Sequence, residues 1–324
     1  MKNKRVLITG GAGFIGSHLV DQLACQKEKP EAIVVVDNFF LGRMSNLSVA
    51  LAESPEILRV YREDASDFSA MSSIFERESI DVVFDLAVKP LPYSFINPEG
   101  ACNTSVRIAS LMAEFQRKGA FKTLIHFSSS EAYGNAKYVP MDEGHPLEPT
   151  TPYSAGKAAA DLLLLSYYKT FGLDLSILRP FNNYGPRQNC TVYAAVIPTT
   201  IRRILDGKEP YITGDGSQTR DLLYVSDTAD AAIKTYYSTA TRGKIINVAS
   251  GKPKSISEII HQIADLMNYK GSIVYEKSRP ADIMTHCGSI DLARQLIDFK
   301  PTVNFEEGLA KTVDWFVNNK GEPE

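Results

Sequence analysis

Short apolar runs alternate with longer amphipathic stretches through the first half of the chain. The runs that read as strands are Arg5–Ile8, Ala32–Val36, Leu58–Tyr61, Val82–Leu86 and Leu124–Ser128. The stretches with helical spacing between them are Gly16–Cys25, Asp67–Glu78, Pro98–Lys118 and Tyr153–Phe171. Continuously apolar strands are buried on both faces, and a helical crossover joins parallel neighbours. The pattern predicts an α/β fold with a doubly wound parallel sheet.

The pattern changes in the second half. A sixth strand, Asp174–Leu178, ends at Arg179-Pro180, and Pro, Gly and Asn then divide the chain into shorter elements. We therefore expect one domain over residues 1–180 and a smaller mixed α/β domain over residues 181–324. A strand-like segment at Lys244–Val248 suggests that the chain returns to the large sheet within about residues 220–250.

Composition narrows the class of protein. The 324 residues are 44 % hydrophobic and 23 % charged, as in soluble globular proteins. A net charge of -3 argues against a nucleic-acid partner. The four cysteines show no CxxC spacing and the five histidines no HxH or HxxxH cluster, so we expect no metal site. The apolar runs are too short for a membrane span or a signal segment, and we expect a cytoplasmic protein.

A glycine-rich turn joins the first strand to the first helix. The segment contains Gly10, Gly13, Phe14, Ile15 and Gly16 and satisfies both GxGxxG and GxxGxxG spacing. Such glycines permit a tight turn and let the backbone approach a pyrophosphate at a helix N-terminus. Following directly after a strand, the motif predicts a dinucleotide site of the Rossmann type.

The end of the second strand indicates which dinucleotide binds. Asp37 follows Gly16 by roughly 20 residues, where a carboxylate accepts the adenosine ribose hydroxyls and repels a 2′-phosphate. This favours NAD over NADP, although an aspartate can also cap a turn. Asp64 could reach the adenine amino group or be an ordinary loop aspartate. The other residues expected around NAD are Asn38, Ala65, Leu86, Ala87 and Lys89.

A Tyr-x-x-x-Lys pair begins the fourth helical stretch. Tyr153 and Lys157 share one helix face, and hydroxyls including Ser129 crowd the end of the fifth strand, where ligands bind in open α/β sheets. Oxidation of a secondary alcohol needs a base for the hydroxyl proton. Tyr153 suits that role if nearby positive charge lowers its pKa, with Lys157 supplying charge and holding the nicotinamide ribose. Ser129 would hydrogen-bond the alcohol oxygen.

Seven motifs in order carry a family resemblance: TGGAGFIG, Asp37-Asn38, FSSSEAYG, PYSAGK, RPFNNYGP, GDGSQTRD and RPAD. Between about residues 5 and 315 the chain resembles the extended short-chain dehydrogenase/reductase family, and within it the NAD-dependent nucleotide-sugar epimerases and dehydratases. The resemblance implies tightly held NAD, transient oxidation of a hexose at C4, and a homodimer. It also places the catalytic hydroxyl on Ser129, four residues before Tyr133.

The two residues after that hydroxyl bear on the reaction. Ser130-Glu131 resembles the pair in glucuronate decarboxylases and GDP-mannose 4,6-dehydratases, whereas simple 4-epimerases have small or neutral polar residues there. A 4-keto sugar has an acidic C5 proton, and Glu131 is the residue type that removes it. We therefore favour chemistry at C5, with a 4-epimerase as the alternative. Pro92 stands where relatives often have arginine, which weakens the case for a glucuronate 4-epimerase.

The second half supplies candidates for substrate binding. By resemblance, Arg220 and Arg279 clamp the diphosphate of a UDP-, dTDP- or GDP-sugar, and arginine forks suit paired phosphate oxygens. Asn182 is expected at the diphosphate or sugar and Arg187 near the nucleoside. The segments Val196–Pro198 and Tyr211-Ile212 are expected to enclose the base.

Two other functions are disfavoured by the same residues. A non-catalytic NAD-binding sensor is disfavoured because Ser129, Tyr153 and Lys157 are all present. A reductase that uses free NADPH is disfavoured by Asp37. A dimer is expected through Pro98–Lys118 and Tyr153–Phe171, whose apolar residues Leu111, Met112, Leu163 and Leu164 are expected to present surface.

Overall fold

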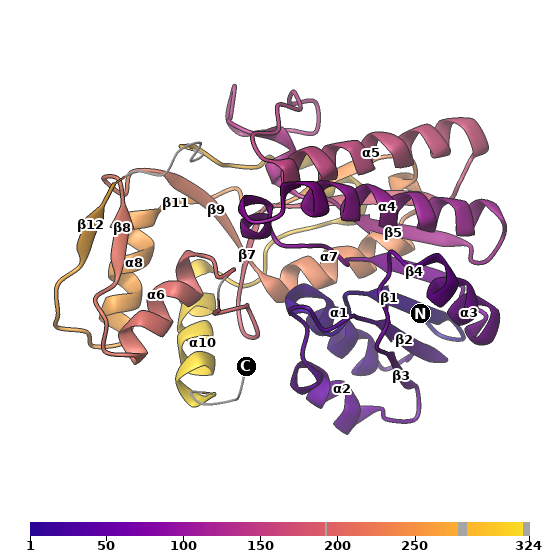
Figure 1. Cartoon of the computed structure of the whole chain (residues 1–324), viewed down its shortest axis with the longest axis horizontal. Helices are drawn as coiled ribbons and strands as arrows, with labels where there is room; N and C mark the ends of the chain where they lie inside the picture. The colour runs from indigo at the N-terminus through magenta and orange to yellow at the C-terminus, as the bar shows by residue number, and fades with distance from the viewer. Residues whose placement is uncertain (192, 278–283, 320–324) are drawn as a thin grey trace.

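A seven-stranded parallel sheet forms the larger half of the molecule. The computed structural model describes residues 1–191, 193–277 and 284–319 (Figure 1). The strand order is β10-β6-β5-β4-β1-β2-β3. The strands are β1 (Arg5–Thr9), β2 (Ala32–Val36), β3 (Leu58–Tyr61), β4 (Val82–Asp85), β5 (Thr123–Phe127), β6 (Leu175–Pro180) and β10 (Ile245–Val248).

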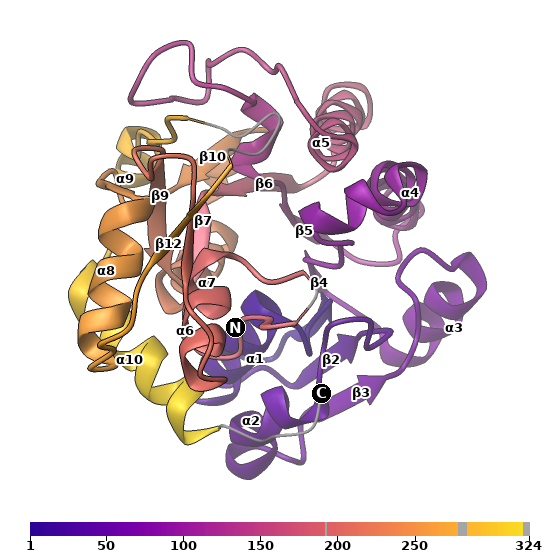
Figure 2. The same ribbon diagram turned by 60° about the vertical axis from the view of Figure 1, so that its left-hand side comes forward.

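Helices cover both faces of this sheet because alternate strand residues point to opposite sides. In β1, Val6 and Ile8 pack into one core and Leu7 into the other. Figure 2 shows one layer in a row along one side of the sheet. That layer is α3 (Phe68–Glu78), α4 (Pro98–Arg117) and α5 (Pro152–Phe171). The opposite layer is α1 (Phe14–Ala24), α2 (Ser48–Glu53), α7 (Val225–Tyr237) and α9 (Asp291–Ile297).

The smaller half has its own core of short elements. A three-stranded sheet has the order β11-β9-β7, and a second sheet pairs β12 with β8. Its strands are β7 (Asn182–Tyr184), β8 (Tyr211–Thr213), β9 (Thr219–Tyr224), β11 (Pro253–Ser255) and β12 (Val274–Glu276). Its helices, α6 (Val196–Leu205), α8 (Ile256–Leu266) and α10 (Phe305–Asn318), bury Ile201, Ile259 and Leu309 in one cluster.

The predicted doubly wound parallel sheet is confirmed, since every pairing within it is parallel. The segment predicted at Lys244–Val248 does return to the sheet, as β10 beside β6. The sequence pattern did not indicate α2 or the 3₁₀ turns. These turns are η1 (Met44–Leu47), η2 (Leu91–Phe95), η3 (Ser130–Tyr133) and η4 (Thr239–Thr241).

The surface expected on α4 and α5 needs correction. Leu111, Met112 and Leu164 are at most 6 % exposed and belong to the core between these helices and the sheet. Leu163 is only partly buried, and Leu162 is 59 % exposed. Consecutive leucines point to more than one side of the helix, so the sequence pattern alone does not show which of them faces outward. The exposed residue is Leu162, one position before the predicted Leu163.

Within residues 1–191, 193–277 and 284–319, no helix is long and apolar enough to cross a membrane.

Candidate active site

The glycine turn and the start of α1 line one end of a cleft of about 400 Å³. Gly10 has a φ of +65°, and a Cβ on Gly16 would lie 2.2 Å from the Gly10 carbonyl oxygen, so side chains are excluded there. Gly13 caps α1 without a side-chain hydrogen bond. The first-turn N–H groups can therefore bind an anion such as a pyrophosphate, with no side chain competing for them.

Asp37 lies at the end of β2 and lines the same cleft. Its carboxylate accepts hydrogen bonds from the backbone N–H groups of Ala12 at 3.0 Å and Phe39 at 2.8 Å. Burial raises the pKa of Asp37, while these backbone bonds lower it. The carboxylate therefore steadies the glycine turn as well as facing the position expected for the adenosine ribose.

All of the other predicted cofactor residues also line this cleft. They are Phe14, Ile15, Asn38, Asp64, Ala65, Leu86, Ala87 and Lys89. Asn38 donates a hydrogen bond to Asp64 at 2.8 Å. The Thr9 hydroxyl accepts from the N–H groups of Leu86 and Ala87, at 3.0 Å each, and so ties the end of β4 to β1. The glycines, the uncapped helix and Asp37 together fit a dinucleotide.

The predicted catalytic side chains meet where this cleft joins a second, larger one. Ser129 and Tyr153 line both clefts, and Lys157 lines the cofactor cleft. Thr151 caps α5 by accepting a hydrogen bond from the Ser154 N–H at 3.2 Å, which fixes the turn carrying Tyr153. Lys157 donates to the Phe127 carbonyl at 2.6 Å. The helix α5 is thereby held to the end of β5.

The surroundings of Tyr153 favour its neutral form. Burial raises the pKa of Tyr153 to about 12; a hydrogen bond with Ser129 lowers it and the charge of Glu131 raises it further. Burial also lowers the pKa of Lys157, against the attraction of Asp85 and Asp161. The sequence led us to expect a lowered pKa for Tyr153, but the protein groups around it raise that pKa instead. Tyr153 therefore needs added positive charge to act as a base at neutral pH.

A buried ion pair supports the catalytic strand from behind. Asp161 on α5 accepts hydrogen bonds from the Ser128 hydroxyl at 2.6 Å and from Arg179 at 2.5 Å. Both charged side chains are at most 1 % exposed. The pair joins α5 to β5 and β6 next to Ser129, although the sequence motifs did not single it out.

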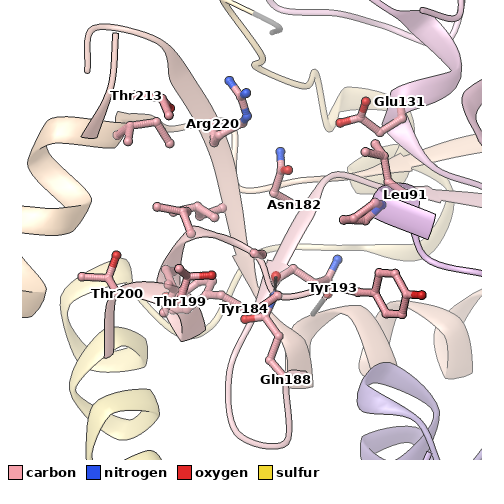
Figure 3. A pocket seen from close by; sticks show the side chains of 18 of the residues that line it. Leu91, Glu131, Asn182, Tyr184, Gln188, Tyr193, Thr199, Thr200, Thr213 and Arg220 are labelled. Carbon is pink, nitrogen blue, oxygen red and sulfur yellow. Dashed lines mark hydrogen bonds between the residues drawn. The ribbon is translucent and has the colours of Figure 1, made fainter. Parts of the chain in front are cut away.

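The larger cleft has a volume of about 1030 Å³ and lies between the two halves of the chain. It is lined by six residues that the sequence predicted to be catalytic or substrate-binding: Ser130, Glu131, Asn182, Val196, Tyr211 and Arg220. Figure 3 shows the Glu131 carboxylate and Arg220 pointing in from opposite sides, with Asn182 between them. Asn182 pairs with Leu222 in the β7–β9 register, which puts Asn182 and Arg220 on one sheet face.

One predicted substrate arginine, Arg187, does not line this cleft. Arg187 lines the cofactor cleft instead, where it forms an ion pair with Asp21 at 2.6 Å. Its φ of 68° turns the chain at this point, and α1 provides the carboxylate that draws it to that side. Arg279 lies outside the described residues.

The sequence motifs also missed several lining residues. Phe40 borders the cofactor cleft, and Asn183, Gln188 and Tyr193 line both clefts. Arg203 also lines the larger cleft, and its guanidinium lies 5.0 Å from the centre of the Tyr211 ring. Periodicity on α6 could have indicated Arg203, and Asn183 lies in β7 within the RPFNNYGP motif, which pointed only to Asn182. Phe40, Gln188 and Tyr193 lie on loops without a motif.

No set of three or more His, Cys, Asp or Glu side chains that could hold a metal ion occurs within the part of the chain that the structure describes.

Comparison with known proteins places this geometry in a family. The model of the GDP-mannose 4,6-dehydratase family matches residues 7–312. A UDP-N-acetyl-alpha-D-glucosaminuronate decarboxylase of Bacillus cytotoxicus is 33 % identical, over 97 % of this chain and 98 % of that protein.

Solved structures agree. The UDP-N-acetylglucosamine 4-epimerase of Methanobrevibacter ruminantium superposes with a TM-score of 0.89 and 36 % identity, over 98 % of this chain and 100 % of that one. A dTDP-glucose 4,6-dehydratase of Streptomyces venezuelae with NAD bound has a TM-score of 0.89 and 27 % identity, covering 98 % of both chains.

The fold and site define an NAD-dependent extended short-chain dehydrogenase/reductase of the nucleotide-sugar type. Within that class, the chain belongs to the GDP-mannose 4,6-dehydratase family. The relatives named above include an epimerase, a dehydratase and a decarboxylase, so similarity by itself leaves the reaction open.

Proposed function

We propose that this protein oxidises the sugar of a nucleotide-diphosphate sugar transiently at C4 and then acts at C5, as a 4,6-dehydratase or a decarboxylase. The observation that carries the proposal is the position of Glu131. Its carboxylate points into the cleft that Ser129 and Tyr153 also line, and its charge raises the pKa of Tyr153. A carboxylate within electrostatic reach of the proton acceptor for C4 is well placed for the neighbouring C5 proton.

Each catalytic side chain has a separate task. NAD, when bound, supplies the acceptor for the C4 hydride. Tyr153 takes the proton of the 4-hydroxyl, and Ser129, hydrogen-bonded to Tyr153, orients that oxygen. Lys157 provides the chain's own positive charge on the same helix face, and its bond to the Phe127 carbonyl fixes its position. In the dehydratase reaction, Glu131 then removes the C5 proton, which the C4 carbonyl has made acidic, and the C6 hydroxyl leaves as water. In the decarboxylase reaction, the C5–C6 bond breaks as carbon dioxide leaves, and Glu131 would instead deliver a proton to C5.

The remainder of the larger cleft suits the nucleotide part. Arg220 is a planar cation that can grip paired phosphate oxygens, with Asn182 beside it as a neutral donor. Val196 and Tyr211 border the end where we place the base, and Arg203 lies against the Tyr211 ring. Uracil, thymine and guanine are all candidates for that base.

A second candidate is a nucleotide-sugar 4-epimerase. The observation that favours it is the 36 % identity to the Methanobrevibacter ruminantium 4-epimerase over nearly the whole chain. Such a reaction would use Ser129, Tyr153 and Lys157 in the same way, but it would leave the C5 proton in place.

We also propose that the protein is a cytoplasmic homodimer associated through α4 and α5. The exposed Leu162 on α5 supports this, because burying a large apolar side chain in an interface with a second copy of the chain is favourable.

A panel of UDP-, dTDP- and GDP-sugars tests the proposed reaction. Products would be separated and weighed by mass spectrometry. Loss of water identifies a dehydratase, and loss of carbon dioxide identifies a decarboxylase. An isomer of unchanged mass would favour the 4-epimerase. Absence of any product across the panel, with NAD bound, would contradict a nucleotide-sugar substrate.

A further inference from the structure

Three aromatic side chains from distant parts of the chain meet beside the cofactor cleft. Phe40 follows β2, Tyr93 lies in η2 after β4, and Tyr193 lies between β7 and α6. The Phe40 ring centre is 5.5 Å from that of Tyr93 and 5.8 Å from that of Tyr193. The Tyr93 and Tyr193 centres are 6.0 Å apart. Each ring therefore packs against both others, and the cluster joins the two halves of the molecule.

A cation adds to this cluster. The Lys89 ammonium lies 3.7 Å from the centre of the Phe40 ring and 5.8 Å from that of Tyr93. An ammonium over an aromatic face is attracted by the ring quadrupole. Lys89 was expected to contact the cofactor directly. In this structure its charge holds Phe40 and also lowers the pKa of Asp64 across the cofactor cleft.

The cluster serves the cleft and not the core. Phe40, Tyr93 and Tyr193 are absent from the three hydrophobic cores of the described chain, and Phe40 is 39 % exposed. Phe40 and Lys89 line the cofactor cleft, while Tyr193 lines both clefts. In Figure 3 the Tyr193 side chain reaches away from its own segment toward Leu91, which belongs to the larger half.

We infer that Phe40, Tyr93 and Tyr193 form an aromatic clasp that retains NAD(H) in its cleft between the two half-reactions. The inference rests on the proposed function, in which the reduced cofactor must stay bound until it is reoxidised. While the three rings are packed together, Tyr193 stays against Phe40 and Tyr93 at the edge of the cleft. Release of the cofactor then requires these rings to separate, and the attraction between the rings slows its departure.

The test is the rate at which bound NAD leaves the intact protein. Protein loaded with labelled NAD would be mixed with excess unlabelled NAD, and the label still bound would be followed in time without sugar present. Phe40→Ala and Tyr193→Ala remove one ring each, and Phe40→Leu keeps apolar bulk but loses the ring. We expect release to be about tenfold or more faster in each, because each ring packs against two others.

The matched control is Phe171→Ala. Phe171 is also exposed, lies 5.3 Å from the Tyr167 ring and 5.6 Å from the Arg117 guanidinium, and is on α5 away from both clefts. Its removal should leave NAD release within about twofold of wild type, since it borders neither cleft. In the double variant Phe40→Ala/Tyr193→Ala, the increase in the NAD release rate should be smaller than the product of the two single increases. Both single variants already break the same Phe40–Tyr193 ring pair.

The outcomes separate the clasp from the proposed function. Wild-type release rates in Phe40→Leu and Tyr193→Ala, with thermal melts unchanged, would overturn the clasp. Fast release in these variants but not in Phe171→Ala would support it, whatever sugar the enzyme uses. Failure of the sugar panel with slow NAD release in wild type would overturn the proposed function and leave the clasp as a device for holding cofactor.

Discussion

At the residue scale, the motif positions were the predictable part of the site. Gly10 and Gly16 were predictable because a pyrophosphate must approach the backbone closely, and Asp37 because a carboxylate binds the ribose hydroxyls. The structure brings all three residues to one cleft. Arg187 could not be placed from its motif, because the partner that draws it away, Asp21, is set by the fold. The aromatic clasp could not be predicted from the sequence either, because its three rings are far apart in the chain and only the fold brings them together.

Asp37 gives a prediction about cofactor choice. Purified protein should carry NAD and not NADP, since a carboxylate facing the ribose repels a 2′-phosphate. Asp37→Ala should weaken NAD binding roughly tenfold to a hundredfold, because charge-assisted hydrogen bonds are removed and the Ala12 and Phe39 N–H groups lose their acceptor. Chromatography of cofactor released on denaturation, together with titration calorimetry, measures both. A wild-type preference for NADP would contradict the assignment.

At the scale of elements, the large sheet was predictable and the small half was not. Five strands, β1, β2, β4, β5 and β6, are almost wholly buried and gave apolar runs that located them to within two residues. The edge strand β3 is partly exposed but was also located. By contrast β7, β8, β11 and β12 have three residues each, too few to show any period. The site on the small half was therefore located by motif and not by element.

The docking of α5 onto the sheet depends on Asp161. Asp161→Ala would leave the Arg179 charge buried without its partner, and we expect a loss of about 3–5 kcal/mol in the free energy of unfolding. Urea denaturation measures this. The control Asp230→Ala removes the exposed pair with Lys234 and should cost under about 1 kcal/mol. Equal losses in the two variants would contradict a stabilising role for the buried pair.

At the scale of the whole molecule, acid stability should report on His286. It is fully buried, and burial together with the charge of Arg220 lowers its pKa from 6.5 to about 4. The pKa of His286 is lower in the folded state than in the unfolded state, so the neutral side chain contributes its full stabilisation above pH 6.5. This contribution is lost as the pH falls from 6.5 through 4. The loss amounts to roughly 3 kcal/mol.

Denaturation at a series of pH values tests this. His286→Gln should flatten the fall in the free energy of unfolding between pH 6.5 and 4. The control is His261→Gln, because His261 is exposed and should leave the curve unchanged. The same slope in wild type and His286→Gln would show that other groups cause the acid sensitivity.

Assembly is the other property of the whole molecule. Wild type should be a dimer at micromolar concentration in light scattering, and Leu162→Asp should shift it to monomer by placing a charge in an apolar interface. Leu266→Asp, an equally drastic change at an exposed position on α8, should stay dimeric. A monomeric wild type, or a dimer that tolerates Leu162→Asp, would contradict association through α5.

The central claim, chemistry at C5 with Glu131 as the base, is tested most directly by solvent deuterium. Wild type would turn over its nucleotide sugar in D₂O, and the label at C5 of the product would be read by NMR, with Glu131→Gln in parallel. We expect deuterium at C5 in wild type. In the variant, final product should fall by roughly a hundredfold or more while reduced cofactor or a 4-keto sugar accumulates. No deuterium at C5, with near-normal turnover by Glu131→Gln, would contradict the claim and favour the 4-epimerase.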